Sequence, residues 1–333
     1  MPRRMVGIFM MTHLQRHPAA VDFFISQYQC PRPVNWARQF DRTAPLDLEI
    51  GFGLGEFLIR TAEQNPERNF VGIEYDGLRI KKTLRRIERI NALSAPAQGL
   101  RNIRVLQIDA HVALERLFRP RSLARVFCLF PCPWPKKKHI KYRLFSREFL
   151  RLVNSRLQAR GFLHIVTDHK AYRDWIVSQD TRCGFRLTSR VIRPGYDTKY
   201  ERKWIAAGQK KFYELVFTKT RHIAVGLRRD AVLKTFYLPD FPGPDFRFRN
   251  RTGDPAIILK KLTFDSRRKS GMLHFVVAER NLTQYVCLRV VLGCQGWEIA
   301  LAEDQPVLPT PGVARAVREV FLQAKTQMKQ GCS

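Results

Sequence analysis

Residues 46 to 57 read LDLEIGFGLGEF, a short apolar run followed at once by three glycines in alternate positions. The run has the length of a β-strand, and a helical pattern begins at Gly55. Glycines at a strand-to-helix turn let the backbone adopt unusual conformations and let a ligand approach it closely. The stretch therefore predicts the first strand of an α/β sheet, with a ligand-binding loop at its carboxyl end.

The pattern of alternating strands and helices continues for more than a hundred residues after this stretch. Five strands are expected, at 46–50, 69–75, 103–109, 123–130 and 161–168, with helices starting near Gly55, Leu78, Val112 and Phe145 between them. Such alternation implies right-handed crossovers into a parallel sheet. After a helix near 171–178, strands at 185–192 and 211–219 follow with no readable helix between them, which predicts an antiparallel hairpin at the sheet edge.

A change in pattern near residue 220 suggests a second domain. Alternating stretches such as MLHFVVAE (272–279) and TQYVCLRVVL (283–292) indicate strands, and one helical run extends from Val313 to Met328. We expect an N-terminal extension over 1–44, a main α/β domain over 45–220 and a smaller α+β or β-rich accessory domain over 221–333.

Three acidic residues lie at successive strand ends behind the glycine loop: Glu49, Glu74 and Asp109. One such acid is more often a helix cap than a ligand contact. Three at neighbouring carboxyl ends favour a nucleotide-like ligand, with Glu74 placed to accept ribose hydroxyls. The glycine pattern departs from GxGxxG because its sixth position is Glu56, which argues against a pyrophosphate-binding loop.

The charge balance predicts a polyanionic partner. The chain has 59 Lys and Arg against 29 Asp and Glu, a net charge of +30, and most of the excess precedes residue 221. Nucleic acid is the first candidate and an anionic membrane surface the second, although no lipid signal or membrane-length apolar run is present. The basic residues of helix 78–91 face either solvent or phosphates.

The seven cysteines form no CxxC pair and no zinc-like Cys/His set, so free thiols, no metal site and a cytoplasmic location are expected.

The loop after the fourth strand, FPCPWPKKKH (130–139), combines three prolines with a lysine cluster. The prolines exclude a helix there and predict a stiff loop. Trp134 has two readings, an anchor that packs the loop or a surface on which a base stacks. The lysines face either solvent or the phosphates around an extruded nucleotide.

Several of these motifs together resemble a known family. EIGFGLG (49–55) resembles the first motif of S-adenosylmethionine-dependent methyltransferases. PCPWPKKKHIKYR (131–143), TDHKAYRDW (167–175) and DTKYERKW (197–204) resemble the bacterial tRNA (guanine-N7)-methyltransferase family, from about Trp36 to Lys219. The resemblance implies a Rossmann-like class I methyltransferase fold, with a mostly parallel seven-stranded sheet and an antiparallel edge hairpin. It also implies S-adenosylmethionine as cofactor and guanosine 46 of tRNA as target.

The resemblance further implies roles for individual residues. The cofactor contacts would be Glu49, Gly51, Gly53, Gly55, Glu74 and Asp109. The substrate contacts would be Lys136, Asp168, Thr198, Lys199, Tyr200 and Glu201. For Asp168 a helix N-cap, and for Thr198 to Glu201 an ordinary polar loop, are the structural alternatives. tRNA is the expected partner, with no membrane and no obligate protein partner, and the chain is expected to be a monomer or homodimer.

Cys132 departs from the family, whose motif has an aspartate at this position with a catalytic role. Three interpretations stay open. The substitution slows the chemistry but is tolerated, or a thiolate favoured by Lys136 to Lys138 replaces the acid, or the chain binds tRNA without methylating it. The first is favoured, because Asp168 and Glu201 remain to orient the base. A methyltransferase acting on a different RNA atom is a further alternative.

Overall fold

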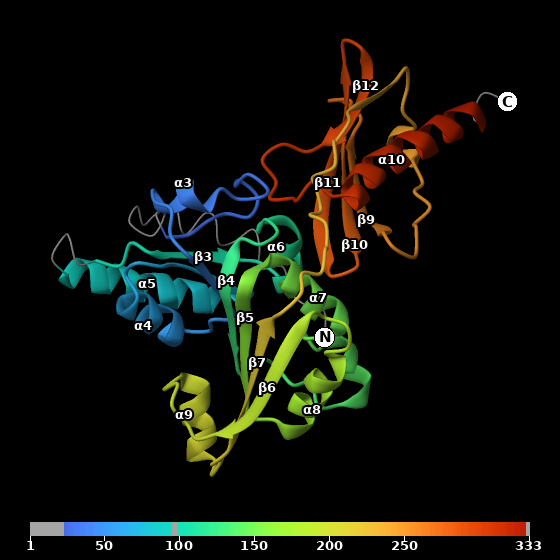
Figure 1. Cartoon of the computed structure of the whole chain (residues 1–333). Coiled ribbons are helices and arrows are strands. Elements are labelled where there is room, and N and C mark those ends of the chain that lie inside the picture. Colours follow the sequence, from blue (N-terminus) through green and yellow to red (C-terminus); the bar gives the residue numbers. More distant parts are fainter. Residues whose placement is uncertain (1–22, 95–98, 331–333) are drawn as a thin grey trace. The chain divides into compact units, whose positions relative to one another are not determined.

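A computed structural model of the chain describes residues 23–94 and 99–330 (Figure 1). It contains one compact unit that ends at Arg228 and a second that begins at Arg229. The expected N-terminal extension, 1–44, lies partly outside the described residues. None of the helices in these two ranges is long and apolar enough to cross a lipid bilayer.

Residues 221–228, which the sequence pattern places in the accessory domain, pack with the first unit. The Asn154 amide accepts a hydrogen bond from the Ile223 backbone N–H at 2.8 Å and donates one to the Arg221 carbonyl at 3.0 Å. The fully buried Arg156 guanidinium donates to the carbonyls of Val225 and Gly226. Buried backbone groups need such partners, so this connection belongs structurally to the first unit.

The first unit is an α/β sandwich around a seven-stranded sheet. Its elements are α3 (Trp36–Phe40), β1 (Leu46–Ile50), α4 (Glu56–Gln64), β2 (Asn69–Glu74), α5 (Gly77–Leu93), β3 (Ile103–Gln107), α6 (Ala110–Arg116), β4 (Leu123–Leu129), η1 (Lys137–Tyr142), α7 (Arg147–Arg156), β5 (Leu157–Thr167), α8 (Lys170–Gln179), β6 (Phe185–Ile192), α9 (Lys199–Ala206) and β7 (Phe212–Lys219). The strand order is β3-β2-β1-β4-β5-β7-β6. Strands β1 to β5 pair in parallel, and β7 pairs antiparallel with both β5 and β6.

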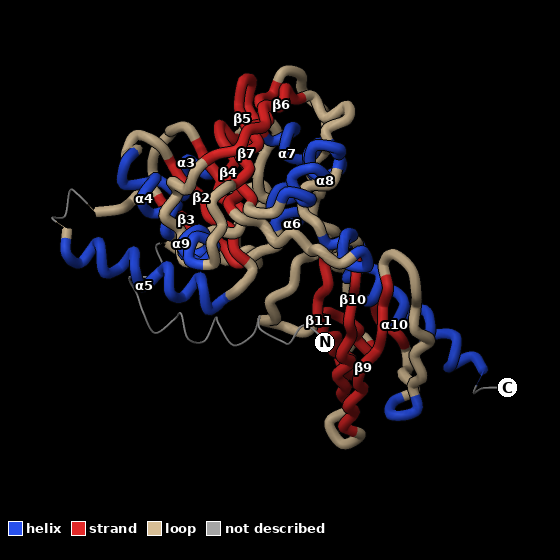
Figure 2. Tube along the Cα trace, turned by 90° about the horizontal axis from the view of Figure 1, so that it is seen from below, coloured by secondary structure: helices blue, strands red, loops and turns tan. Residues whose placement is uncertain are grey.

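This topology confirms the predicted fold. Every residue of β1 and β2 is buried, as expected for parallel strands covered on both faces. Figure 2 shows α5 lying along the outside of this unit. The carboxyl ends of β1, β2, β3, β4 and β5 meet at one edge of the sheet, which is where the glycine loop lies.

The prediction of no helix between 192 and 211 is wrong, because α9 lies there. Its sequence, KYERKWIA, contains four charged residues, and Glu201 is the helix's single buried residue. A helix without an apolar stripe gives no periodic signal. The proline loop also ends earlier than expected: η1 begins at Lys137, directly after the last proline-stiffened residues.

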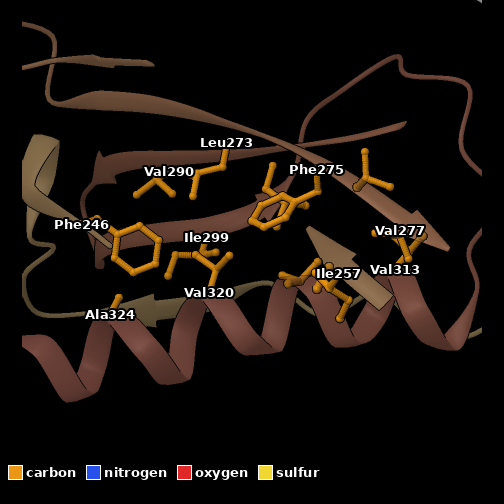
Figure 3. Packing of buried hydrophobic residues seen from close by; sticks show 14 of the residues in the cluster. Phe246, Ile257, Leu273, Phe275, Val277, Val290, Ile299, Val313, Val320 and Ala324 are labelled. Carbon is orange, nitrogen blue, oxygen red and sulfur yellow. The ribbon is translucent and has the colours of Figure 1, made fainter. Parts of the chain in front are cut away.

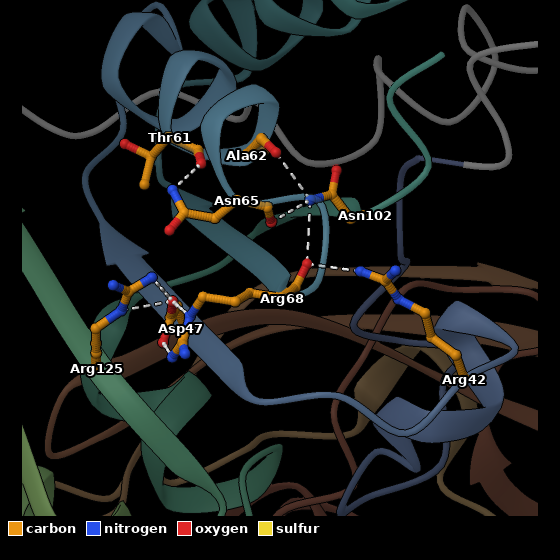
Figure 4. A network of polar contacts seen from close by, with 8 residues as sticks. All are labelled: Arg42, Asp47, Thr61, Ala62, Asn65, Arg68, Asn102 and Arg125. Atoms are coloured by element: carbon orange, nitrogen blue, oxygen red, sulfur yellow. Dashed lines mark hydrogen bonds and ion pairs between the residues drawn. The ribbon is translucent and has the colours of Figure 1, made fainter. Parts of the chain in front are cut away.

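A network of polar contacts holds the amino end of β1 in place (Figure 4). Asp47 is fully buried, and its carboxylate accepts two hydrogen bonds from Arg68, both at 2.7 Å, and one from Arg125 Nε at 2.7 Å. The Asn102 amide donates to the carbonyls of Ala62, Asn65 and Arg68. This network fixes the connections at the sheet edge opposite the glycine loop.

The second unit is a five-stranded antiparallel sheet covered on one face by a long helix. It comprises β8 (Phe236–Leu238), η2 (Gly243–Asp245), β9 (Ala256–Asp265), β10 (Ser270–Glu279), β11 (Leu282–Gly293), β12 (Gly296–Leu301) and α10 (Pro311–Gln330), with strand order β8-β12-β11-β10-β9. Val313, Val320 and Ala324 of α10 pack against Phe275 and Ile299 of the sheet (Figure 3). The predicted β-rich region is therefore present, with its own hydrophobic core.

Candidate active site

The loop between β1 and α4 has the conformation that its glycines predict. Gly51, Gly53 and Gly55 all have positive φ angles, 73°, 59° and 70°. A Cβ added to Gly55 would lie 2.5 Å from Thr83 Cγ2 of α5, so only glycine lets the two helices approach this closely. A Cβ at Gly51 would meet no atom within 4 Å, so there the backbone borders open space.

That open space is part of a cavity of about 230 Å³ at the carboxyl edge of the sheet. Four segments enclose it: the glycine loop, the start of α5, the end of β4 and the start of α9. Its lining residues are Glu49, Gly51, Phe52, Gly53, Leu54, Glu56, Phe57, Asp76, Leu78, Arg79, Lys82, Leu129, Phe130, Thr198, Lys199 and Tyr200. The predicted cofactor loop and most of the TKYE motif therefore lie around one cavity, although the motifs are about 145 residues apart in the chain.

Glu49 is the most unusual group in this cavity wall. It is 5% exposed, and its Oε2 atom has no hydrogen-bond partner among the described residues. Burial, with a smaller contribution from the nearby Glu74 carboxylate, raises the pKa of Glu49 to about 8. A buried carboxylate without a partner is costly, and a ligand bearing a positive amino group would relieve that cost.

The other two acidic residues that the sequence analysis selected, Glu74 and Asp109, accept hydrogen bonds from backbone N–H groups. The Glu74 carboxylate accepts hydrogen bonds from the backbone N–H groups of Gly53 (3.0 Å), Tyr75 (2.7 Å) and Asp76 (3.0 Å), which fixes the glycine loop against the end of β2. Asp109 caps α6 through the His111 N–H at 2.8 Å. Neither lines the cavity. Asp76, which the sequence analysis did not select, caps α5 and does line it.

The TKYE motif forms the start of α9 and closes over the glycine loop. The Thr198 hydroxyl caps the helix by accepting the Glu201 N–H at 3.2 Å. The Lys199 N–H donates to Glu56 Oε2 at 2.5 Å, and Arg202 forms an ion pair with the same carboxylate. Glu56 at the start of α4 thus binds α9 to the loop. The position of Glu56 directly after GxGxG was the available signal for this role.

Glu201 lies beneath this contact and shapes the preceding turn. It is 2% exposed, and its carboxylate accepts the backbone N–H groups of Gly195 (2.8 Å), Tyr196 (2.9 Å) and Asp197 (2.5 Å). Thr198 and Glu201 occupy the positions of a capping box. In this structure the Glu201 carboxylate therefore organises the segment before α9.

Tyr196 in that turn connects to a second polar cluster, which sequence reasoning missed. Its hydroxyl lies 3.1 Å from both His164 Nε2 and Glu214 Oε1, and the Glu214 carboxylate also forms an ion pair with Arg190. Burial lowers the pKa of His164. The cluster joins β5, β6 and β7 to the turn, and single residues on separate strands give no local motif that would reveal it.

The proline loop is anchored by Arg143. This side chain is 9% exposed, donates to the Pro133 carbonyl at 2.9 Å, and lies 5.3 Å and 5.1 Å from the ring centroids of Tyr172 and Trp175 on α8. Trp134 is half-buried and packs with His139 and Tyr142 at centroid distances of 5.6 Å and 5.4 Å. The anchor reading of Trp134 thus has contacts to support it.

Seven predicted site residues do not line the cavity. Four of them, Gly55, Glu74, Asp109 and Glu201, are described above, and the other three are Cys132, Lys136 and Asp168. Cys132 and Lys136 are exposed on the proline loop, whose first residue, Phe130, does line the cavity. Asp168 follows β5 and is half-buried, and this burial raises its pKa. The cap of α8 is His169, whose Nδ1 accepts the Tyr172 N–H at 3.1 Å, so Asp168 is not that cap.

Comparisons with known proteins identify related methyltransferases. The family model Methyltransf_4, which describes methyltransferases, matches residues 43–214. A tRNA (guanine-N(7)-)-methyltransferase of Chlorobium phaeobacteroides is 42% identical over 178 residues, which covers 54% of this chain and 83% of that protein. One from Nitrosomonas eutropha is 35% identical over 216 residues, covering 62% and 92%.

Among solved structures, the 16S rRNA methyltransferase KamB aligns with a TM-score of 0.43 at 20% identity, covering 55% of this chain and 92% of that one.

Proposed function

Because the chain belongs to the tRNA (guanine-N7)-methyltransferase family, we propose that it methylates N7 of guanosine 46 in the tRNA variable loop. The cofactor is S-adenosylmethionine, which supplies an electrophilic methyl group on a sulfonium when it is bound. The observation that carries the proposal is the buried Glu49 side chain in the wall of the glycine-loop cavity, whose Oε2 atom has no hydrogen-bond partner among the described residues. Its chemistry suits the amino group of this zwitterionic cofactor.

Residues in the cavity wall, and acids at the strand ends beside it, would have distinct roles toward such a cofactor. Glu49 would bind its ammonium group, and the backbone of Gly51 and Gly53 would leave room for it. Gly55 would contribute at the edge of the loop, where it lets α4 approach α5. Glu74 would accept ribose hydroxyls, and Asp109 would lie beside the adenine. Glu74 already accepts three backbone hydrogen bonds, so its carboxylate is held in place before any ligand arrives.

The reaction requires little acid–base catalysis by the protein. N7 of guanine carries an in-plane lone pair and no proton, so no general base is needed, and the product ring is cationic. The chain's tasks are therefore alignment and stabilisation of positive charge on the base. We assign these tasks to Asp168 and the Thr198–Glu201 segment, where Thr198, Lys199 and Tyr200 line the cavity and Glu201 acts by holding its turn. Lys136 would contact phosphate.

Cys132 favours a second candidate function, that of a weakly active or inactive tRNA-binding homologue. The family aspartate at this position would stabilise the cationic base, and an exposed thiol offers less. Methylation of another RNA atom is the other alternative.

The test is to incubate the purified chain with methyl-labelled cofactor and bulk tRNA, and to map 7-methylguanosine by reductive strand scission. We expect one scission site, at position 46, and none with a transcript in which adenosine replaces guanosine 46. Label without scission would favour another RNA atom, and tRNA binding without label would favour the non-catalytic alternative.

A further inference from the structure

Helix α5 carries a row of basic side chains on the face opposite its buried side. Ile80, Leu84 and Ile87 are buried against the sheet. The exposed cations Lys82, Arg85, Arg86 and Arg89, here called the α5 basic face, recur at the spacing of successive helical turns. At about 100° per residue they lie within an arc of about 100°, centred opposite the buried side.

The α5 basic face has no ion-pair partner among the described residues. None of its four side chains forms an ion pair in 23–94 or 99–330, although Arg79 on the same helix pairs with Glu74 and Asp76. Lys82 with Arg86, and Arg85 with Arg89, are like charges four residues apart, and each such pair costs a helix about 0.2 to 0.5 kcal/mol. These like-charge pairs therefore destabilise helix α5, and a bound polyanion would offset that cost.

The α5 basic face is continuous with the candidate active site. Leu78, Arg79 and Lys82 in the first turns of α5 line the cavity, and Arg85, Arg86 and Arg89 follow on the next turns. From Lys82 to Arg89 the helix rises by about 10 Å, along the outside of the unit (Figure 2). A polymer that places one residue at the cavity would therefore pass over this row.

We propose that the α5 basic face binds the sugar-phosphate backbone of the tRNA next to the methylated guanosine. The inference rests on the proposed function, since the polyanion is the substrate itself. Phosphates are matched by evenly spaced cations without base-specific contacts, and such contacts position an RNA without reading its sequence. The surface should hence contribute affinity and placement for every tRNA that the enzyme accepts.

The experiment compares the full-length chain with R85Q/R86Q/R89Q, which leaves the cavity-lining Lys82 in place. Glutamine preserves helix propensity. Fluorescence anisotropy with a tRNA transcript at 50 to 200 mM salt gives Kd and its salt dependence, and calorimetry gives S-adenosylmethionine affinity. We expect tRNA Kd to rise at least tenfold at low salt, and the log–log salt slope to become shallower by about 2 to 3. Cofactor affinity should stay within twofold.

The matched control is R267Q/R268Q/K269Q, which removes three cations from the exposed turn between β9 and β10. An equal loss in this control would show that only net charge matters and would overturn the inference. R85K/R86K/R89K keeps the charges and should bind tRNA as the wild type does, which separates charge from helix stability. Loss in this variant too, with its fold retained, would also count against phosphate contact.

Two further outcomes separate this inference from the proposed function. Wild-type protein that forms 7-methylguanosine while R85Q/R86Q/R89Q keeps the wild-type tRNA Kd would reject the α5 basic face alone. Wild-type protein that forms no 7-methylguanosine would reject the proposed function, and the anisotropy series would still report on α5. Weaker binding of R85Q/R86Q/R89Q to phosphatidylserine vesicles but not to tRNA would assign the surface to a membrane instead.

Discussion

At Cys132 the chain has a thiol where the motif that it resembles has an aspartate. The structure places this side chain on the exposed part of the proline loop, outside the cavity wall. The loop backbone is held independently of it, through the Arg143 contact with the Pro133 carbonyl. A substitution at position 132 should therefore alter charge near the substrate without altering the loop.

We expect Cys132→Asp to raise kcat for tRNA methylation by about tenfold or more, since a carboxylate stabilises the cationic base as it forms. Cys132→Ala should stay within about threefold of the wild type. Single-turnover methylation at saturating tRNA measures both. A large loss in Cys132→Ala would instead give the thiol a role of its own, and no gain in Cys132→Asp would locate the charge stabilisation elsewhere.

If Glu49 binds the cofactor's ammonium group as proposed, cofactor binding should depend on pH. Its pKa is raised to about 8, mainly by burial, so at neutral pH the carboxyl is largely protonated in the cofactor-free protein. Pairing with an ammonium group needs the ionised form. Binding should therefore release close to one proton at pH 7, and affinity should increase by up to about tenfold per pH unit as pH rises towards 8.

Calorimetry in buffers of different ionisation enthalpy measures this proton release. Glu49→Gln should bind more weakly and release no proton from this site. The cofactor-free wild type should also lose stability as pH rises from about 4.5 to about 8, because the folded state binds a proton that the unfolded state has lost. Affinity that does not change with pH in the wild type would contradict this role of Glu49.

At the scale of elements, the contact between α9 and the glycine loop forms the cavity. The Glu201 carboxylate accepts three backbone N–H groups of the turn before α9, and the α9 start lines the same cavity as the glycine loop. A residue that touched only tRNA would affect tRNA alone. A residue that organises this turn should affect both ligands.

Glu201→Ala should therefore weaken S-adenosylmethionine and tRNA binding together and lower the free energy of unfolding by about 1 to 3 kcal/mol, because it leaves buried donors without a partner. Calorimetry, anisotropy and urea unfolding measure the three effects. Glu63→Ala, at an exposed position on α4, is the control. A change in tRNA affinity alone would restore a direct substrate contact.

At the scale of the whole molecule, the chain contains two units with separate hydrophobic cores. The core of the second unit joins the inner face of its sheet to α10 and involves residues from 238 to 324. The cavity lies wholly in the first unit, and its lining residues fall between 49 and 200. Damage to one core should leave ligand binding by the other unit intact.

Phe275→Ala should destabilise the second unit by about 3 to 5 kcal/mol, because it opens a cavity at a side chain that is 1% exposed. Differential scanning calorimetry should show an earlier transition for this unit, while S-adenosylmethionine affinity at 25 °C stays at the wild-type value. Tyr285→Ala, 54% exposed on β11, is the control. Loss of cofactor binding in folded Phe275→Ala would show that the units depend on each other.

Patterns within short windows were sufficient for the class of fold and the position of the glycine loop. The periodicity of strands and helices is a property of neighbouring residues, and so are the glycines that the turn at 51–55 requires. Both can therefore be recognised in LDLEIGFGLGEF without the tertiary structure. The same holds for the resemblance to the methyltransferase family, which the comparisons confirm. The sequence pattern did not predict helix α9, because this helix buries a single side chain, Glu201.

The partners of each carboxylate depended on packing between distant segments. Glu49, Asp109 and Glu201 have similar side chains, yet one lacks a partner, one caps a helix and one holds a turn. Glu56 meets Lys199 across 143 residues of chain. No local sequence pattern predicts such contacts, because the tertiary arrangement of the sheet edges and helices determines the hydrogen-bond partners and the desolvation of each side chain.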